Sequence, residues 1–150
     1  MQPLADDDRP VVLCVAPSLI DDYWPHVQPH LSAGMIVADM DPGKTVNALL
    51  RGEYLLWVVT TDDHSGVRAA FLTAIVADGH RRVIEIGALA GKGAWDWAQA
   101  VSARMAEYAR AEGAATYRFC GVPAWSRLLP ECRVTGHHSR GVPIYEGVAA

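Results

Sequence analysis

Apolar and polar residues along this chain switch between two periods, one typical of strands and one typical of helices. Compact apolar or alternating runs predict seven strands, over 11–15, 53–60, 67–77, 82–86, 116–120, 132–136 and 142–148. Helical spacing predicts four helices, over 19–31, 45–51, 94–111 and 123–129. The order is β-α-α-β-β-β-α-β-α-β-β, which predicts a mixed α/β domain around a mixed, mostly antiparallel sheet.

The sequence supports two of the predicted helices to different degrees. The segment 94–111 carries an apolar stripe at offsets of three and four residues, and Gly113 supplies its end. The segment 19–31 contains Pro25 and Pro29, and proline removes a backbone donor inside a helix. We therefore expect the first helix to be short, irregular or broken, and to end at Gly34.

Composition narrows the class of protein. The chain has 150 residues and a net charge of −4, with scattered basic residues, so we expect no nucleic-acid or membrane-surface partner. Residues 1–10 are predicted to be a flexible segment before a single domain over 11–150. We see no signal peptide and no transmembrane run, and the spacing of the cysteines and histidines predicts no metal site.

A glycine-bearing loop after the strand 82–86 is the most suggestive local feature. The residues Ala88-Leu89-Ala90-Gly91-Lys92-Gly93 lead directly into the long helix at Ala94. Glycines let a ligand approach the backbone, and the first N–H groups of a helix attract anions. A phosphate held here would also offset the unfavourable charge of Lys92 near a helix start. The alternative is a loop that keeps only the shape of such a site.

The element order and this loop resemble the GNAT family, the Gcn5-related N-acetyltransferases, over nearly the whole chain. The family's pyrophosphate loop has the pattern Gln/Arg-x-x-Gly-x-Gly/Ala, and Gly91 and Gly93 match it, whereas Ala88 replaces the leading Gln/Arg. The resemblance implies that acetyl-CoA, if it binds, meets Ala88, Leu89, Ala90, Gly91, Lys92, Gly93 and Ala94.

A narrower likeness is to small GNAT-like proteins of tailed bacteriophages. It rests on Trp95 and Trp97 after the loop, and on Gly121, Trp125, Arg127 and Leu128 in order, with Val122 where an arginine is expected. This resemblance implies a virion or assembly component in the virion or host cytoplasm, whose partners are other phage proteins or copies of itself. Trp95, Trp125 and Arg127 are its predicted partner surface.

Two residues are candidates for acid–base chemistry. Family members often place a glutamate on the strand before the loop, which here is Glu85, and use a late tyrosine, which here is Tyr145. Alternation puts Glu85 on the opposite sheet face from Ile84 and Ile86. A solvated strand carboxylate and an ordinary strand aromatic are the alternative interpretations.

The sequence favours one function and leaves two alternatives open. The first is a catalytically degenerate virion or assembly protein, favoured by Ala88 and by the bulky Trp95 and Trp97 at the loop exit. The second is a CoA-dependent N-acyltransferase that acetylates an amine, favoured by Gly91, Gly93 and Glu85. The third is a regulatory module that binds a ligand or a host protein. For Trp95, either a contact surface or a plug over the glycine loop is consistent with its position.

Overall fold

The computed structural model describes residues 9–61 and 66–150. Its strands are β1 (Pro10–Val15), β2 (Leu55–Thr61), β3 (Val67–Asp78), β4 (Arg81–Gly91), β5 (Thr116–Cys120), β6 (Arg133–His137) and β7 (Pro143–Val148). Its helices are α1 (Ile20–Val37), α2 (Pro42–Leu50), α3 (Ala94–Ala111) and α4 (Trp125–Leu128), with a short 3₁₀ turn, η2 (Pro17–Leu19), before α1.

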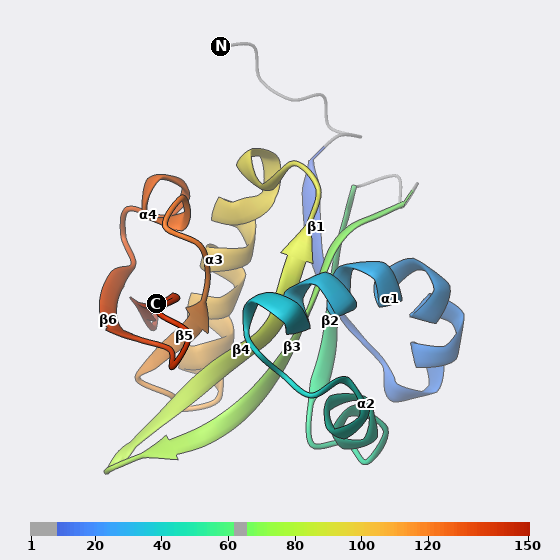
Figure 1. The fold of residues 1–150 in the computed structure, drawn as a ribbon, viewed down its shortest axis with the longest axis horizontal. Helices are drawn as coiled ribbons and strands as arrows, with labels where there is room; N and C mark the ends of the chain where they lie inside the picture. Colours follow the sequence, from blue (N-terminus) through green and yellow to red (C-terminus); the bar gives the residue numbers. More distant parts are fainter. Residues whose placement is uncertain (1–8, 62–65) are drawn as a thin grey trace.

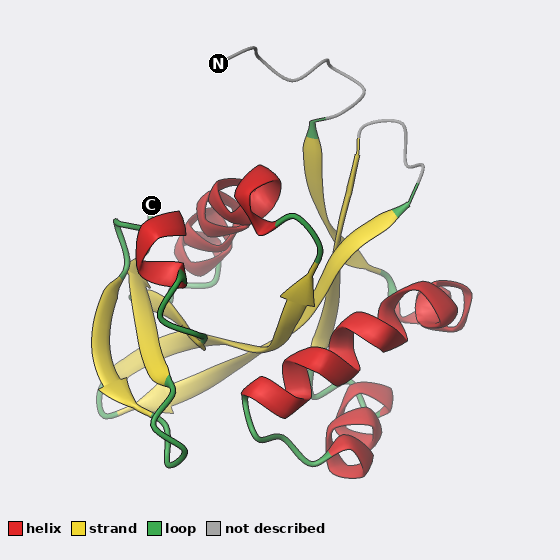
Figure 2. Ribbon diagram, turned by 45° about the horizontal axis from the view of Figure 1, so that its top comes forward, coloured by secondary structure: helices red, strands yellow, loops and turns green. Residues whose placement is uncertain are grey.

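The strands form one sheet in the order β1-β2-β3-β4-β5-β7-β6. Only β4 and β5 pair in parallel, and every other neighbouring pair is antiparallel. Helices α1 and α2 lie on one face of the sheet, and α3 and α4 lie on the other (Figures 1 and 2). The predicted fold class and element order are confirmed.

Each face of the sheet buries its own core. On the α3 face, Trp57 and Phe71 stack against each other and pack with the helix stripe that includes Trp97 and Met105. On the α1 face, the largest buried side chains come from α1 and the first strands, such as Leu31 and Leu56. Burial of a side chain of this size contributes about 1.5–3 kcal/mol to stability. The alternating strands thus hold one helical layer on each side.

The expectation for the first helix was wrong. Helix α1 runs without interruption for 18 residues and contains Pro25, Pro29 and Gly34. The two prolines are four residues apart and exposed, so their rings and the carbonyls they leave unbonded face solvent. Gly34 lies on the buried face of the helix, where a Cβ would overlap the carbonyl group of Ala88. Gly34 therefore marks close helix–sheet contact and not a helix end.

Other boundaries moved by a few residues. Strand β1 begins at Pro10, within the segment predicted to be flexible, while residues 1–8 lie outside the described part of the chain. Strand β4 extends to Gly91, five residues further than predicted, because it continues to pair with β3. Among the described residues, no helix is both long and apolar enough to cross a membrane.

Candidate functional site

The parallel pairing of β4 and β5 ends in the middle of the sheet. The last partners are Ile86 and Phe119, although β4 continues to Gly91 on its β3 side. Between Gly87 and Ala90 the register of β4 against β3 shifts, and Ala88 adopts φ 54, a left-handed conformation that is unfavourable for alanine. At this point β4 carries a bulge, and β5 no longer pairs with it. Such bulges are frequent near active sites.

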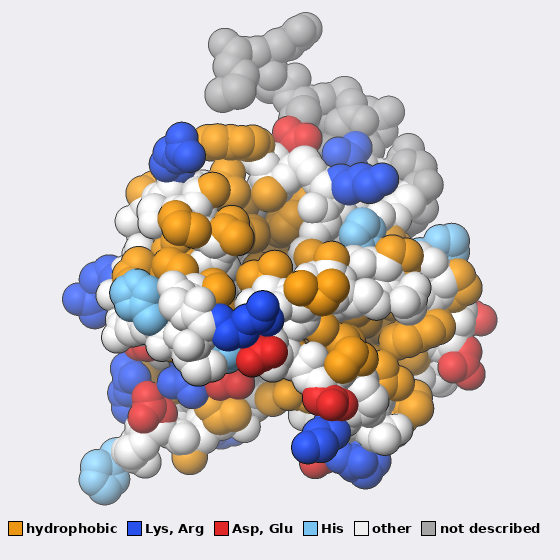
Figure 3. Space-filling view, in the orientation of Figure 1, with side chains coloured by type: hydrophobic (Ala, Val, Ile, Leu, Met, Phe, Trp, Pro, Cys, Tyr) orange, Lys and Arg blue, Asp and Glu red, His pale blue; other side chains and the backbone are white. Residues whose placement is uncertain are grey.

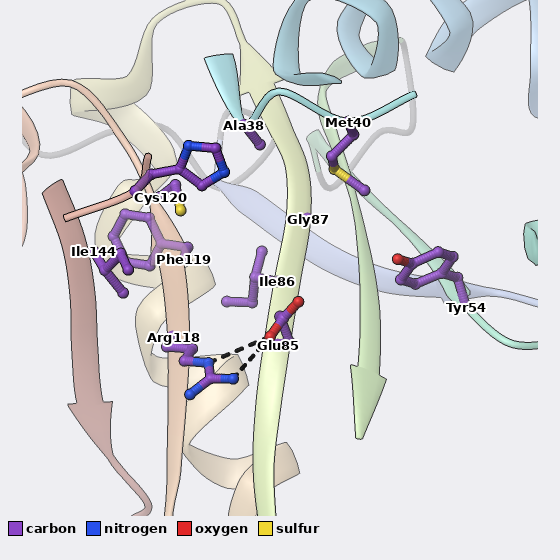
Figure 4. Close-up of a pocket in the computed structure, with 11 residues that line it drawn as sticks. Ala38, Met40, Tyr54, Glu85, Ile86, Gly87, Arg118, Phe119, Cys120 and Ile144 are labelled. Carbon is purple, nitrogen blue, oxygen red and sulfur yellow. Dashed lines mark hydrogen bonds and ion pairs between the residues drawn. The ribbon is translucent and has the colours of Figure 1, made fainter. Parts of the chain in front are cut away.

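A pocket of about 410 Å³ lies at this point on the α1 face. Its lining includes Glu85 and Gly87 from β4, Arg118 and Cys120 from β5, and Ile144 from β7 (Figure 4). The connection between α1 and α2 supplies Ala38 and Met40, and Met40 packs against Gly87. The remaining lining residues are Tyr54, Ile86, Phe119 and His138.

The opposite rim of the pocket is the connection between β6 and β7. Arg140 in this connection donates to the Ile36 carbonyl at 3.3 Å and approaches the Asp39 carboxylate at 3.5 Å. These contacts bridge the connection to the end of α1. Because exposed ion pairs contribute at most about 1 kcal/mol, the pair between Arg140 and Asp39 adds little to the stability of this rim.

Glu85 is the carboxylate of the pocket. Arg118 donates from Nε at 3.3 Å and from Nη2 at 3.0 Å, and both bonds go to Oε2 of Glu85. No described residue bonds to the other carboxylate oxygen, Oε1, and the side chain is 47% exposed. The arginine thus orients Glu85 and leaves one oxygen able to accept a hydrogen bond from a ligand.

Two weakly acidic groups share the pocket with Glu85. Burial raises the pKa of the Cys120 thiol above its ordinary value, the charge of Glu85 adds to this, and Arg118 opposes it. Burial and the charges of Glu85 and Glu53 raise the pKa of Tyr54. Both groups are therefore protonated at neutral pH, so they can donate hydrogen bonds, and Cys120 is not an activated nucleophile.

This state of Cys120 predicts slow alkylation. At pH 7–8, iodoacetamide should modify Cys120 in the folded protein more slowly than the same cysteine in urea, because only the thiolate reacts. The difference should shrink as pH rises through the raised folded pKa. Peptide mass spectrometry separates Cys120 from exposed Cys14 and buried Cys132. Equal rates for folded and unfolded Cys120 at pH 7–8 would contradict the raised pKa.

Tyr145 lies on the other face of the sheet from Glu85. It pairs with Phe119 in the strand register, stacks on its ring at 5.2 Å and is 1% exposed. Its hydroxyl donates to the Val122 carbonyl at 3.1 Å and lies 3.3 Å from Ser126 Oγ. The two predicted catalytic residues are therefore not brought together, and the role of Tyr145 as an acid stays a prediction.

The glycine loop is shorter than the sequence suggests. Ala88, Leu89, Ala90 and Gly91 are the end of β4, so only Lys92 and Gly93 connect it to α3. A Cβ on Gly91 would lie 2.5 Å from the Arg68 carbonyl oxygen, which also accepts the Lys92 N–H. Gly91 and the backbone of Lys92 therefore pack against β3. Only Gly93 and the first turn of α3 are left open to a ligand.

Gly93, the residue before α3, has a left-handed conformation with φ 67, and no side chain of the described residues caps the helix. Trp97 donates from Nε1 to the Lys92 carbonyl at 2.7 Å, which fixes the connection against the helix. Lys92 is exposed and has no acidic partner within the described residues. This arrangement suits an anion through free N–H groups and one cation, although Asp96 in the same turn weakens the attraction.

The predicted partner surface divides into two parts. Trp95 is 76% exposed, so it does not plug the glycine loop, and Arg127 is also exposed. Trp125 instead packs against Trp97 and Phe119, with ring centroids 5.9 and 5.4 Å apart. Trp125 is therefore largely a structural residue, and only Trp95 and Arg127 offer free surface.

Of the eleven residues that line the pocket, only Glu85 was predicted as a site residue. The others include five with polar or sulfur-containing side chains, which are Met40, Tyr54, Arg118, Cys120 and His138. The alternation of residues along the sequence contained a signal for two of them, Arg118 and Cys120. Alternation along β5 puts Tyr117 and Phe119 in the α3-face core, so Arg118 and Cys120 had to face the other side. The other three come from connections or strand ends, whose position depends on tertiary structure.

Comparison with known proteins supports the fold. No family model and no curated protein sequence matches the chain. Among solved structures, FeeM, an N-acyl amino acid synthase from uncultured soil microbes, is 12% identical with a TM-score of 0.65, over 94% of this chain and 91% of that one. The ribosomal-protein-S5-alanine acetyltransferase of Vibrio fischeri is 11% identical with a TM-score of 0.61, over 95% and 94%.

A third similar structure contains coenzyme A. The N-acetylglutamate synthase of Neisseria gonorrhoeae, solved with coenzyme A and N-acetyl-glutamate, is 12% identical with a TM-score of 0.61. The match covers 97% of this chain but 36% of that protein. At these identities the likeness concerns the fold. The chain has the mixed α/β fold of the GNAT acetyltransferases.

Proposed function

We propose that this protein is a CoA-dependent N-acyltransferase, which transfers an acyl group from a thioester to a primary amine. The observation that carries the proposal is the pocket at the end of the β4–β5 pairing, where Glu85 presents an unbonded carboxylate oxygen beside the bulge at Ala88. The solved structures with the same fold include acetyltransferases and a coenzyme A complex.

The N-terminus of α3 is the proposed place for the phosphates of the acyl donor. Gly93 and the first turn of α3 provide uncapped N–H groups, and Lys92 provides a free positive charge. Acetyl-CoA bound here would supply the activated thioester. The strand β4 leads from this point back to the bulge and the pocket, a path of a few residues.

Glu85 is proposed to be the general base. Its Oε1 accepts a proton from the acceptor's ammonium group, and Arg118 holds the carboxylate in place through Oε2. The freed amine then attacks the thioester carbonyl. The new C–N bond replaces the C–S bond. The nitrogen gives up its second proton, the sulfur takes up that proton and leaves as a thiol, and Glu85 later returns its own proton to solvent. Tyr54 and Cys120 are the protonated side chains of the pocket that can hydrogen-bond the acceptor.

Thermal unfolding with acetyl-CoA tests the donor site. A ligand at about 100 times its dissociation constant stabilises the folded state by roughly 2.7 kcal/mol. For a domain of this size the melting temperature should rise by roughly 5–10 °C. No rise at saturating acetyl-CoA would contradict the proposal.

A matched pair of variants locates the binding site. Gly93→Trp should abolish the shift, because the side chain would cover the start of α3. Gly79→Trp is the control, since Gly79 has a similar φ of 63, lies in the β3–β4 turn and has no atoms within 4 Å of an added Cβ. Both substitutions carry a similar conformational cost of about 1–2 kcal/mol. A shift that survives in Gly93→Trp would place the donor elsewhere.

The virion, assembly and regulatory roles remain predictions. The solved structures named above give no support to a phage origin or a structural role. The exposed Trp95 is the feature of this chain that keeps a protein partner under consideration.

A further inference from the structure

Four charged residues form a straight row across the open half of the sheet. Glu85 on β4 is the register partner of Arg118 on β5, which pairs with Glu146 on β7, which pairs with Arg133 on β6. Directly paired residues project to the same face of a sheet. The row therefore lies on the face of the Glu85 pocket, and its charges alternate from strand to strand.

The carboxylates in and beside this row are already paired with arginines. Arg118 contacts Asp78 at 3.3 Å as well as Glu85, and Arg81 contacts Asp78 at 3.2 Å and Glu146 at 3.0 Å. Arg133, at the outer edge of the sheet, has no ion pair within residues 9–61 and 66–150. Within the described part of the chain, the row thus begins at a carboxylate with one unbonded oxygen and ends at an arginine without an ion pair.

A second pocket joins the row to the first one. It has a volume of about 470 Å³ and shares Arg118 and Ile144 with the Glu85 pocket. Its other lining residues are Asp78, Arg81, Arg133, Thr135 and Glu146. Three arginines against two carboxylates make this lining positive. The two pockets therefore adjoin at Arg118 and Ile144, and we call them together the groove from Glu85 to Arg133.

This half of the sheet face is open. Helix α1 packs on β3 and β4, whereas the main helix contacts of β5 and β7 are with α3 on the other face. Figures 1 and 2 show α1 and α2 over the β2–β4 side of the sheet, and Figure 3 shows basic and acidic side chains intermixed beside the β3–β4 hairpin. An extended ligand can therefore lie along the groove without displacing a helix.

We infer that the acceptor is the N-terminal amine of a peptide or protein, with an acidic side chain about four residues further on. The inference rests on the proposed acyl transfer at Glu85. Neighbouring strands are about 4.8 Å apart, so three steps from Glu85 to Arg133 span roughly 14 Å. An extended chain covers about 3.3–3.6 Å per residue, so roughly four residues bridge that distance.

The same geometry disfavours a free amino acid as acceptor. Its carboxylate lies too close to its amine to reach Arg133 while the amine is at Glu85. The nearer arginine, Arg118, is already held by Glu85 and Asp78. An acidic side chain at the outer end of the groove instead meets the one arginine of the row without an ion pair among the described residues.

Acyl transfer to a set of peptides tests the inference. Hexapeptides that differ only in having Glu, Gln or Lys at position 5 are compared by kcat/KM with acetyl-CoA and the full-length protein. Exposed ion pairs contribute up to about 1 kcal/mol, so Glu should exceed Gln by roughly threefold and Lys by roughly tenfold at low salt. The preference should weaken at high ionic strength.

Reversing the charge of Arg133 tests whether this residue causes the preference for the Glu peptide. Arg133→Glu should make the Lys peptide the better substrate. Arg82→Glu is the control, because Arg82 is an exposed residue of β4, projects to the α3 face and also has no ion pair within the described residues. A preference that is absent, or unchanged in Arg133→Glu, would overturn the inference.

Assays with free amino acids and simple amines distinguish a failure of this inference from a failure of the proposed function. Free amino acids that are acetylated as efficiently as the Glu peptide would overturn the peptide acceptor and leave the acyltransferase proposal in place. Failure to acetylate any peptide, amino acid or simple amine would count against both the acyltransferase proposal and the inference that rests on it.

Discussion

Replacing Glu85 with glutamine is expected to lower kcat by a factor of roughly 10² to 10⁴, the usual contribution of a positioned general base. The amide keeps the size of the side chain and an oxygen that can accept the Arg118 bonds. It cannot take the proton of the acceptor's ammonium group. The loss should therefore appear in turnover, with the acetyl-CoA melting shift unchanged.

Glu107→Gln is the control for this substitution. Glu107 is an exposed residue of α3, on the other side of the sheet from the pocket, and loses the same charge. Its kcat should stay within about twofold of the wild type. If Glu85→Gln keeps full turnover, Glu85 is a strand carboxylate that only pairs with Arg118, which is the alternative that the sequence left open.

Sequence periodicity predicted a helix or strand correctly where local signals and tertiary packing agree. Helix α3 begins at Ala94 and ends at Ala111, as predicted, because its apolar stripe is continuous and the chain turns at Gly113. Helix α1 was mispredicted because the effect of a proline depends on the face on which it lies. Pro25 and Pro29 are tolerated on the solvent side, while Val27 and Leu31 anchor the buried side.

The site was only partly predictable. Alternation along one strand was enough to separate Glu85 from Ile84 and Ile86. The row from Glu85 to Arg133 depends on which strands are neighbours and in which register, and this information is spread over four segments of the chain. The same limit explains Tyr145, whose strand was predicted but whose sheet face was not.

The bulge at Ala88 links the first helix to the site. Ala88 holds a left-handed φ of 54 and is 1% exposed, and its carbonyl group lies directly against Gly34 of α1. A strained backbone persists only when its surroundings hold it in place. We therefore expect the contact between Gly34 and Ala88 to determine both stability and the shape of β4 beside the pocket.

Gly34→Ala should lower the stability of the fold, although alanine is the better helix former by about 1 kcal/mol. The added Cβ would overlap the Ala88 carbonyl and lie 2.7 Å from its Cα, so α1 or β4 must move. Overpacking of this kind costs typically about 1–3 kcal/mol and sometimes more. We expect a net fall in the melting temperature of several degrees, together with a lower kcat/KM.

Gly43→Ala makes the same substitution in α2 and should have the opposite effect on stability. Its added Cβ would meet only Asp41 Oδ1 at 3.5 Å, an ordinary contact, so the helix propensity gain remains and stability should be unchanged or rise by up to about 1 kcal/mol. Urea unfolding of both variants measures the difference. If Gly34→Ala proves as stable as Gly43→Ala, α1 does not hold the bulge, and the left-handed Ala88 must be maintained by β3 alone.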